Sequence, residues 1–174
     1  MITLISVGGG VLFFFIHQNM LIISWSTFSQ APKYTSKITL SKKINIFFWK
    51  DEKLHKEELV LTWEQENGEK NIHNVISNWI AVLQDEKIIT QQIRLESAAL
   101  SQAQELFLCF NQSPLSQEWP IIKKWRLIES LGKTIRETKL PIRFIVFIVN
   151  DAIMNDDHLD FSQPWPIDGF IKEV

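Results

Sequence analysis

Cysteine and glycine are scarce in this sequence of 174 residues, and its net charge is only -2. The single cysteine, Cys109, cannot close an intramolecular disulfide, and it excludes a zinc site built from several thiolates. Three of the six glycines stand at positions 8–10, so no glycine-rich phosphate loop can be drawn. Lys and Arg number 18 against 20 Asp and Glu, which provides no basic excess for a nucleic acid. Nucleotide enzymes and nucleic-acid partners are therefore disfavoured.

Charged residues are also missing from positions 1–32, where large apolar residues predominate. A helix needs about 20 mostly apolar residues to cross a bilayer, and Trp25 stands where an interfacial aromatic belongs. The sequence therefore predicts a membrane helix at 1–28 and a polar linker at 29–42. A cleaved signal peptide is the alternative, with Ser29-Gln30-Ala31 as a poor cleavage motif.

The remaining 132 residues, 43–174, have the apolar periodicity of one folded domain. Alternating or continuous apolar residues predict strands at 43–49, 59–63, 93–98, 105–110 and 142–149. Spacings of three and four predict amphipathic helices at 72–83, capped by Asn71, and from Pro120 to Ile135. The order ββαββαβ predicts an α+β fold in which the two helices cover one mixed sheet.

Several segments of this domain match, in order, the motifs of a known family. The matching segments are Ile46-Phe47-Phe48-Trp49, Leu95-Glu96-Ser97-Ala98, Leu106-Phe107-Leu108-Cys109-Phe110-Asn111, Ile142-Arg143-Phe144-Ile145-Val146 and His158-Leu159-Asp160-Phe161-Ser162-Gln163-Pro164. The last two resemble "V-R-F-L-V" and "H-x-I-D-L-S-R-P" of the GerMN domain of sporulation and spore germination. The resemblance implies a ring-building α+β unit on the extracytoplasmic side of a membrane, used for assembly and not for catalysis.

We therefore expect a non-enzymatic, membrane-anchored assembly or scaffold domain of the bacterial cell envelope, with a single membrane pass and no cofactor. The membrane and either a second copy or an envelope protein are its expected partners. The resemblance places the domain outside the cytoplasm. Lysines at 33, 37, 42, 43 and 50 follow the apolar run, however, and the positive-inside rule would keep that flank in the cytoplasm, so both orientations stay open.

No residue set predicts a catalytic or metal site. Cys109 lies in a predicted strand and no motif links it to a base, so it is expected to behave as a small hydrophobe. The Asp156-Asp157-His158-Leu159-Asp160 segment carries possible metal ligands, but its spacing matches no EF-hand loop. Such short polar residues after a strand are typical of a loop whose side chains bond to the backbone.

Charge along the second helix and the tail provides candidate interaction residues. The helix carries Lys123, Lys133 and Arg136, among other basic residues, and the tail carries Asp156, Asp157 and Asp160. We expect these two surfaces to meet head to tail between copies, a contact that propagates into a ring or filament. The alternative is that both are ordinary solvated surfaces.

Tryptophan supports a second hypothesis, a binding module for cell-wall glycan or another envelope ligand. Trp79 and Trp125 fall on the two helical stripes and are expected in the core. Trp49, Trp119 and Trp165 would form a stacking surface if they were exposed. A concave aromatic patch would favour ligand binding, whereas flat, charge-complementary surfaces would favour assembly.

Overall fold

The computed structural model describes residues 39–169, which belong to one compact unit that spans Lys37–Val174. The predicted membrane helix at 1–28 lies outside the described residues. Within residues 39–169, no helix is both long and apolar enough to cross a bilayer.

The chain first forms an isolated antiparallel hairpin of β1 (Thr39–Lys50) and β2 (Lys53–Glu64). The two residues that join these strands, Asp51 and Glu52, have φ angles of 49° and 60°. Positive φ at both central residues is the geometry of the tight hairpin turn that matches strand twist. Alternation along β1 buries Ile44, Ile46 and Phe48 on one face.

A second sheet has the strand order β3-β4-β5-β6. Its strands are β3 (Leu95–Leu100), β4 (Glu105–Phe110), β5 (Phe144–Val149), β6 (Ala152–Ile153) and β7 (Trp165–Pro166). The β4–β5 pair is parallel and the other pairs are antiparallel, so the sheet is mixed. The short strands β6 and β7 pair with the end and the start of β5, along the edge that β4 leaves free.

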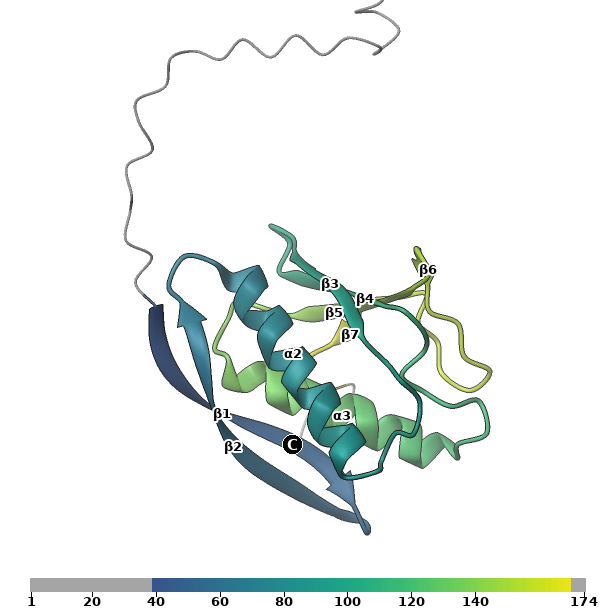
Figure 1. The fold of residues 1–174 in the computed structure, drawn as a ribbon. Coiled ribbons are helices and arrows are strands. Elements are labelled where there is room, and N and C mark those ends of the chain that lie inside the picture. The colour runs from purple at the N-terminus through teal and green to yellow at the C-terminus, as the bar shows by residue number, and fades with distance from the viewer. Residues whose placement is uncertain (1–38, 170–174) are drawn as a thin grey trace, which may run out of the picture. The chain divides into compact units, whose positions relative to one another are not determined.

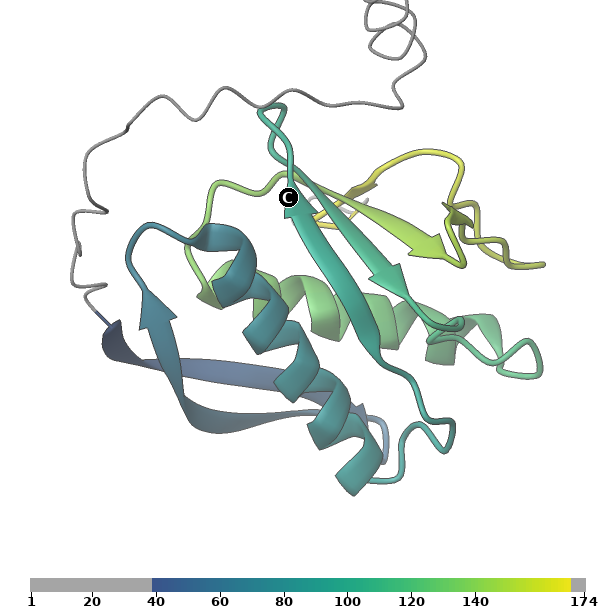
Figure 2. The same cartoon turned by 45° about the horizontal axis from the view of Figure 1, so that its top comes forward.

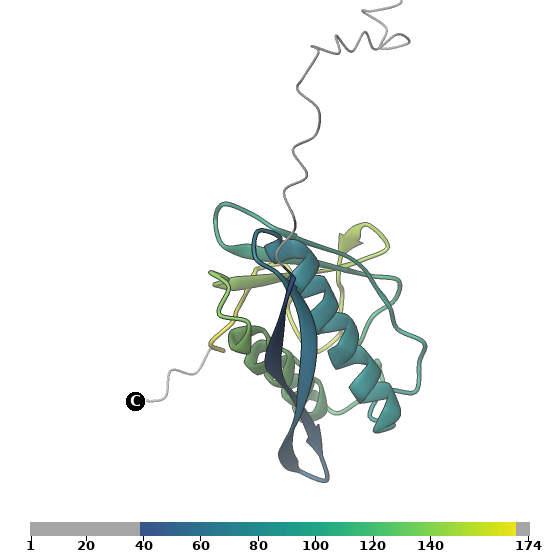
Figure 3. The same cartoon turned by 60° about the vertical axis from the view of Figure 1, so that its left-hand side comes forward.

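Two helices, α2 (Gly68–Asp85) and α3 (Ile121–Glu137), lie between the hairpin and this sheet (Figure 1). Seen from the hairpin side in Figure 3, β1 and β2 lie in front of α3, and α2 runs to their right. Trp79 of α2 has 1% of its surface exposed and donates its indole N–H to the carbonyl of Phe47 in β1 at 3.0 Å. On the other side, Leu106, Leu108 and Phe110 of β4 are fully buried. The helices therefore have two apolar surfaces to cover.

The predicted order ββαββαβ is confirmed, and the structure adds the two short strands. The hairpin, however, forms a sheet of its own, because its apolar face packs on the helices from the side opposite the main sheet. The predicted cap Asn71 is also wrong. Asn67 caps α2 by accepting the Lys70 N–H at 3.0 Å, whereas Asn71 is buried and exchanges hydrogen bonds with the backbone of Glu64.

Candidate functional site

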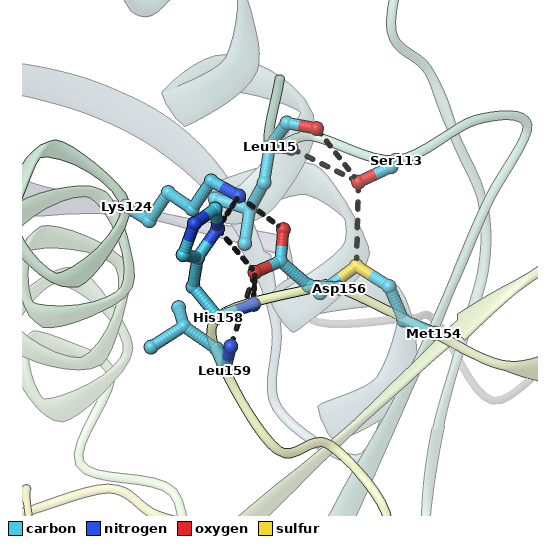
Figure 4. Close-up of polar contacts among 7 residues, drawn as sticks. All are labelled: Ser113, Leu115, Lys124, Met154, Asp156, His158 and Leu159. Atoms are coloured by element: carbon cyan, nitrogen blue, oxygen red, sulfur yellow. Dashed lines mark hydrogen bonds and ion pairs between the residues drawn. The ribbon is translucent and has the colours of Figure 1, made fainter. Parts of the chain in front are cut away.

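The predicted basic face of α3 contains one lysine that points inward. Lys124 is fully buried, and its ammonium donates to the Asp156 carboxylate at 2.5 Å and to Nδ1 of His158 at 3.2 Å. The second carboxylate oxygen of Asp156 accepts the N–H groups of His158 and Leu159 at 2.9 and 3.1 Å. Figure 4 shows how these groups converge from α3 and the loop after β6.

Burial of Asp156 by itself would raise the pKa of its carboxyl group. The hydrogen bonds from Lys124, His158 and Leu159, together with the lysine charge, outweigh that effect and hold the pKa below its ordinary value. Asp156 therefore stays ionised, with 3% of its side chain exposed. It holds the loop against α3 and is not available to a second copy, contrary to the prediction that placed it on an acidic interaction surface.

The remaining contacts in Figure 4 are those of Ser113, and they join two loops without forming a catalytic arrangement. The Ser113 hydroxyl donates to the Leu115 carbonyl at 3.0 Å, accepts the Leu115 N–H at 3.2 Å, and lies 3.6 Å from the sulfur of Met154. These contacts fix the segment before α3 against the end of β6. Across residues 39–169, no three His, Cys, Asp or Glu side chains are grouped to hold a metal ion.

The remaining predicted interaction residues are mostly occupied within the chain. Lys123 places its ammonium 3.9 Å from the centre of the Trp119 ring, and Lys133 pairs with Glu129 at 2.9 Å. Arg136 pairs with Asp168 at 3.2 Å.

Asp157 and Asp160 are exposed on the tail. Asp160 accepts the Ser162 N–H at 2.8 Å, and the hydrogen bonds from Ser162 lower its pKa. The structure therefore brings Lys124 and Asp156 together within one chain, and it joins Lys123, Lys133 and Arg136 to neighbours that the sequence had not paired with them.

A groove of about 830 Å³ runs along α3, between this helix and the segment around β7. Its aromatic and aliphatic wall is formed by Trp49, Ile122, Trp125, Ile128, Ile145, Trp165, Pro166 and Ile167. Its charged wall is formed by Arg126, Glu129, Lys133, Arg136 and Asp168. A smaller hollow of about 290 Å³ shares Trp49 and Arg126 with the groove and adds Trp119 and Lys123. Aromatic and basic side chains therefore form a continuous surface here.

Trp49 is held at the mouth of both hollows by neighbours on α3. Its indole N–H donates to Glu129 at 3.2 Å, and the Arg126 guanidinium stacks 4.9 Å from its ring centre. Arg126 also has a loose contact of 3.8 Å with Glu52, whose side chain is 86% exposed. The half-buried Trp49 ring and the Arg126 guanidinium are thus placed together before any ligand arrives.

Trp125 is less buried than the core position predicted for it, and Trp165, whose exposure the stacking hypothesis required, is buried. Trp125 is half-buried, and its ring meets Trp165 edge to face at 5.5 Å, whereas Trp165 itself is only 4% exposed. The buried stripe of α3 runs through Lys124, Leu127, Ile128, Leu131 and Ile135. Trp125 is about 100° around the helix from Lys124, so it lines the groove and packs against the core only at its edge.

Gly132 lets the groove wall approach the backbone of α3. A Cβ atom at this position would lie 3.0 Å from the carbonyl oxygen of Ile167. Gly132 is not among the residues predicted from the sequence, although a glycine inside a strongly amphipathic helix is a signal of close packing. The width of the groove therefore depends on the absence of one methyl group.

The fold and the groove define a two-helix α+β domain with a concave aromatic and basic site. No family model matches the chain, and no curated protein matches it. Among solved structures, it is similar to a protein described as a "Putative Lipoprotein from Clostridium perfringens", with 17% sequence identity and a TM-score of 0.48. That alignment covers 79% of this chain and 93% of the other.

Proposed function

We propose that this protein is a non-enzymatic binding module of the bacterial cell envelope, and that the groove along α3 holds a cell-wall glycan. The observation that carries the proposal is the placement of Trp49 and Trp125 on one concave surface with Arg126. Ligand sites are concave, of about 300 to 1,000 Å³, and combine apolar walls with a few polar groups. A sugar ring offers an apolar face to an indole and hydroxyl groups to charged side chains.

The same geometry disfavours head-to-tail assembly through charge. That hypothesis needs Lys133 and Arg136 on one copy to meet Asp156 and its neighbours on the next. Asp156 is buried under Lys124, and the two basic residues already have acidic partners at 2.9 and 3.2 Å. Exposed pairs of this kind contribute little, so rearranging them between copies would provide little driving force.

Two features of the sequence support an envelope location. The segment 1–28 is apolar and uncharged, as a membrane anchor requires, and the domain resembles the GerMN family. The binding role, as opposed to catalysis, is supported by the state of the acidic groups in the groove. Glu129 accepts the Trp49 indole N–H and pairs with Lys133, and Asp168 pairs with Arg136, so each acidic group already has a partner within the chain.

Titration calorimetry of the full chain with soluble cell-wall oligosaccharides tests this function. Trp49→Ala should weaken binding at least tenfold, about 1.4 kcal/mol, and Arg126→Ala should weaken it as well. Trp63→Ala is the matched control, because Trp63 is also half-buried under a cation, the Lys42 ammonium at 3.9 Å, but does not line the groove. The absence of wild-type binding, or equal losses for Trp49→Ala and Trp63→Ala, would contradict the proposal.

A further inference from the structure

Arg126 is the basic side chain of the α3 groove that has the weakest contact with a carboxylate. Its side chain is 30% exposed, and its nearest carboxylate oxygen, on Glu52, is 3.8 Å away. That distance is too long for a hydrogen bond, and the guanidinium donates no hydrogen bond elsewhere within residues 39–169. A guanidinium carries five N–H donors in a planar fork. The donors of Arg126 are therefore available to a group that enters the groove.

Most of the other basic side chains around the groove and the smaller hollow beside it already have close carboxylate partners. The pairs, at 2.6 to 3.2 Å, are Lys133 with Glu129, Arg136 with Asp168 and Lys50 with Glu86. The exception is Lys123, which is exposed and whose ammonium lies 3.9 Å from the Trp119 ring centre. Lys123 and Arg126 are three residues apart, so they lie on the same side of α3. These two cations can therefore meet an acidic ligand without losing a close ion pair.

Trp49 fixes the position of Arg126. The guanidinium lies 4.9 Å from the Trp49 ring centre, and the indole N–H of Trp49 is itself tied to Glu129 at 3.2 Å. The electrons of an aromatic ring attract a guanidinium that stacks on it. A side chain that is ordered before binding loses less conformational freedom when the ligand arrives. The Trp49–Arg126 stack therefore presents a cation in a fixed place.

The acidic side chains that line the smaller hollow, Asp51 and Glu52, stand on the turn between β1 and β2. This turn lies beside the first turns of α3 (Figure 2). Both residues are exposed, and neither carboxylate accepts a hydrogen bond within the described part of the chain. Glu52 has a φ angle of 60°, a left-handed conformation that such turns usually give to glycine. The chain therefore holds a glutamate in an unfavourable backbone conformation, with its carboxylate 3.8 Å from Arg126.

We propose that Arg126 selects glycans that carry a carboxylate, and that Glu52 is an internal competitor which this carboxylate displaces. The inference rests on the glycan function proposed above. An arginine and a carboxylate form two parallel charge-assisted hydrogen bonds, a closer contact than the one between Arg126 and Glu52. A neutral sugar would leave the guanidinium without a charged acceptor. The expected ligand is therefore an acidic glycan, such as one that contains a uronic acid or a lactyl ether of a sugar.

Titration calorimetry of the full chain compares two forms of one soluble cell-wall oligosaccharide, the first with free carboxylates and the second with those carboxylates converted to amides. The wild type should bind the acidic form at least about tenfold more tightly, since a hydrogen bond to a charged group contributes that much. Arg126→Gln should abolish this preference by weakening binding of the acidic form alone. Added salt should also weaken binding of the acidic form alone, because salt screens the contact between charges.

Glu52→Gln should strengthen binding of the acidic form by about two- to fivefold, since the exposed ion pair that it removes contributes little. Two matched controls should change neither the affinity nor the preference. Glu57→Gln removes an exposed glutamate of the same hairpin that lines neither hollow. Lys42→Gln removes a cation that lies 3.9 Å from the Trp63 ring centre, away from the groove. Circular dichroism checks that each variant keeps its fold.

The outcomes separate this inference from the glycan function. Equal affinities of the wild type for the acidic and amide forms would overturn the inference and leave the glycan function standing, whereas binding of neither form would overturn both. Displacement of the oligosaccharide by glycerol phosphate but not by glucuronate would assign Arg126 to phosphate ligands and so overturn the choice of a carboxylate. Wild-type affinity of Glu52→Gln for the acidic form would show that Glu52 does not compete.

Discussion

Lys124 and Asp156 form an ion pair in which 0% and 3% of the two side chains are exposed. The pair joins the buried side of α3 to the loop that follows β6, 32 residues later. His158 adds a contact to the lysine, and the backbone N–H groups of His158 and Leu159 donate hydrogen bonds to the carboxylate. The energetic consequence is asymmetric, because removing one partner leaves the other charge buried alone.

Asp156→Asn should therefore lower the free energy of unfolding by about 3 to 5 kcal/mol, measured by urea denaturation at pH 7. The control replaces both partners with apolar residues, as in Lys124→Met with Asp156→Leu. This double variant should recover most of the loss, since neither charge then has to be buried. A loss of less than about 1 kcal/mol in Asp156→Asn would show that water reaches the pair.

The same carboxylate predicts a dependence of stability on pH. Its pKa is lower in the folded chain than the ordinary value of 3.8, so the folded state binds the proton more weakly than the unfolded state. The stabilisation is complete above that ordinary value and is lost as the pH falls through the lowered pKa. The difference in unfolding free energy between wild type and Asp156→Asn should stay constant from pH 7 to pH 5 and shrink below pH 4. Urea titrations at pH 7, 5 and 3 measure it, and a difference that grows in acid would reverse the sign of the argument.

Trp79→Ala should cost about 3 to 5 kcal/mol in thermal or urea unfolding, because it empties a site in the middle layer that is 1% exposed. The variant also removes the hydrogen bond to Phe47 that ties α2 to the hairpin. Trp125→Ala should cost less than half as much, since its ring is half-buried at the groove. Equal losses of stability in the two variants would show that Trp125 is a core residue like Trp79.

Gly132→Ala tests the close approach of the groove wall. Alanine in a helix interior usually stabilises by up to about 1 kcal/mol relative to glycine. Here the added methyl group would lie 3.0 Å from the Ile167 carbonyl, so we expect a net loss of stability. Gly68→Ala in the first turn of α2 is the comparison, because its Cβ would meet a leucine methyl at an ordinary 3.6 Å. Differential scanning calorimetry of both variants is sufficient, and stabilisation by Gly132→Ala would disprove the tight contact.

The sequence by itself determined the element order and the interior of each element, because apolar periodicity reports which face of a helix or strand is buried. The stripe from Ile72 to Leu83 and the strand Glu105–Phe110 were placed in this way. Periodicity carries no information about which sheet a strand joins. The separate hairpin and the pairing of β6 and β7 with β5 follow from contacts between segments far apart in the chain.

The candidate site also combines features that the sequence predicts with features that only the tertiary structure decides. Composition and charge pattern identified the tryptophans and the basic helix. A sequence does not show, however, whether a charged side chain points into the protein or toward solvent. Lys124 and Lys123 are neighbours, and a rotation of about 100° between them puts one in a buried ion pair and the other over the half-buried ring of Trp119. Only the tertiary structure paired Lys124 with Asp156, turned Trp125 toward Trp165 and used Gly132 to bring the groove wall close, because each of these depends on a partner that the local sequence does not contain.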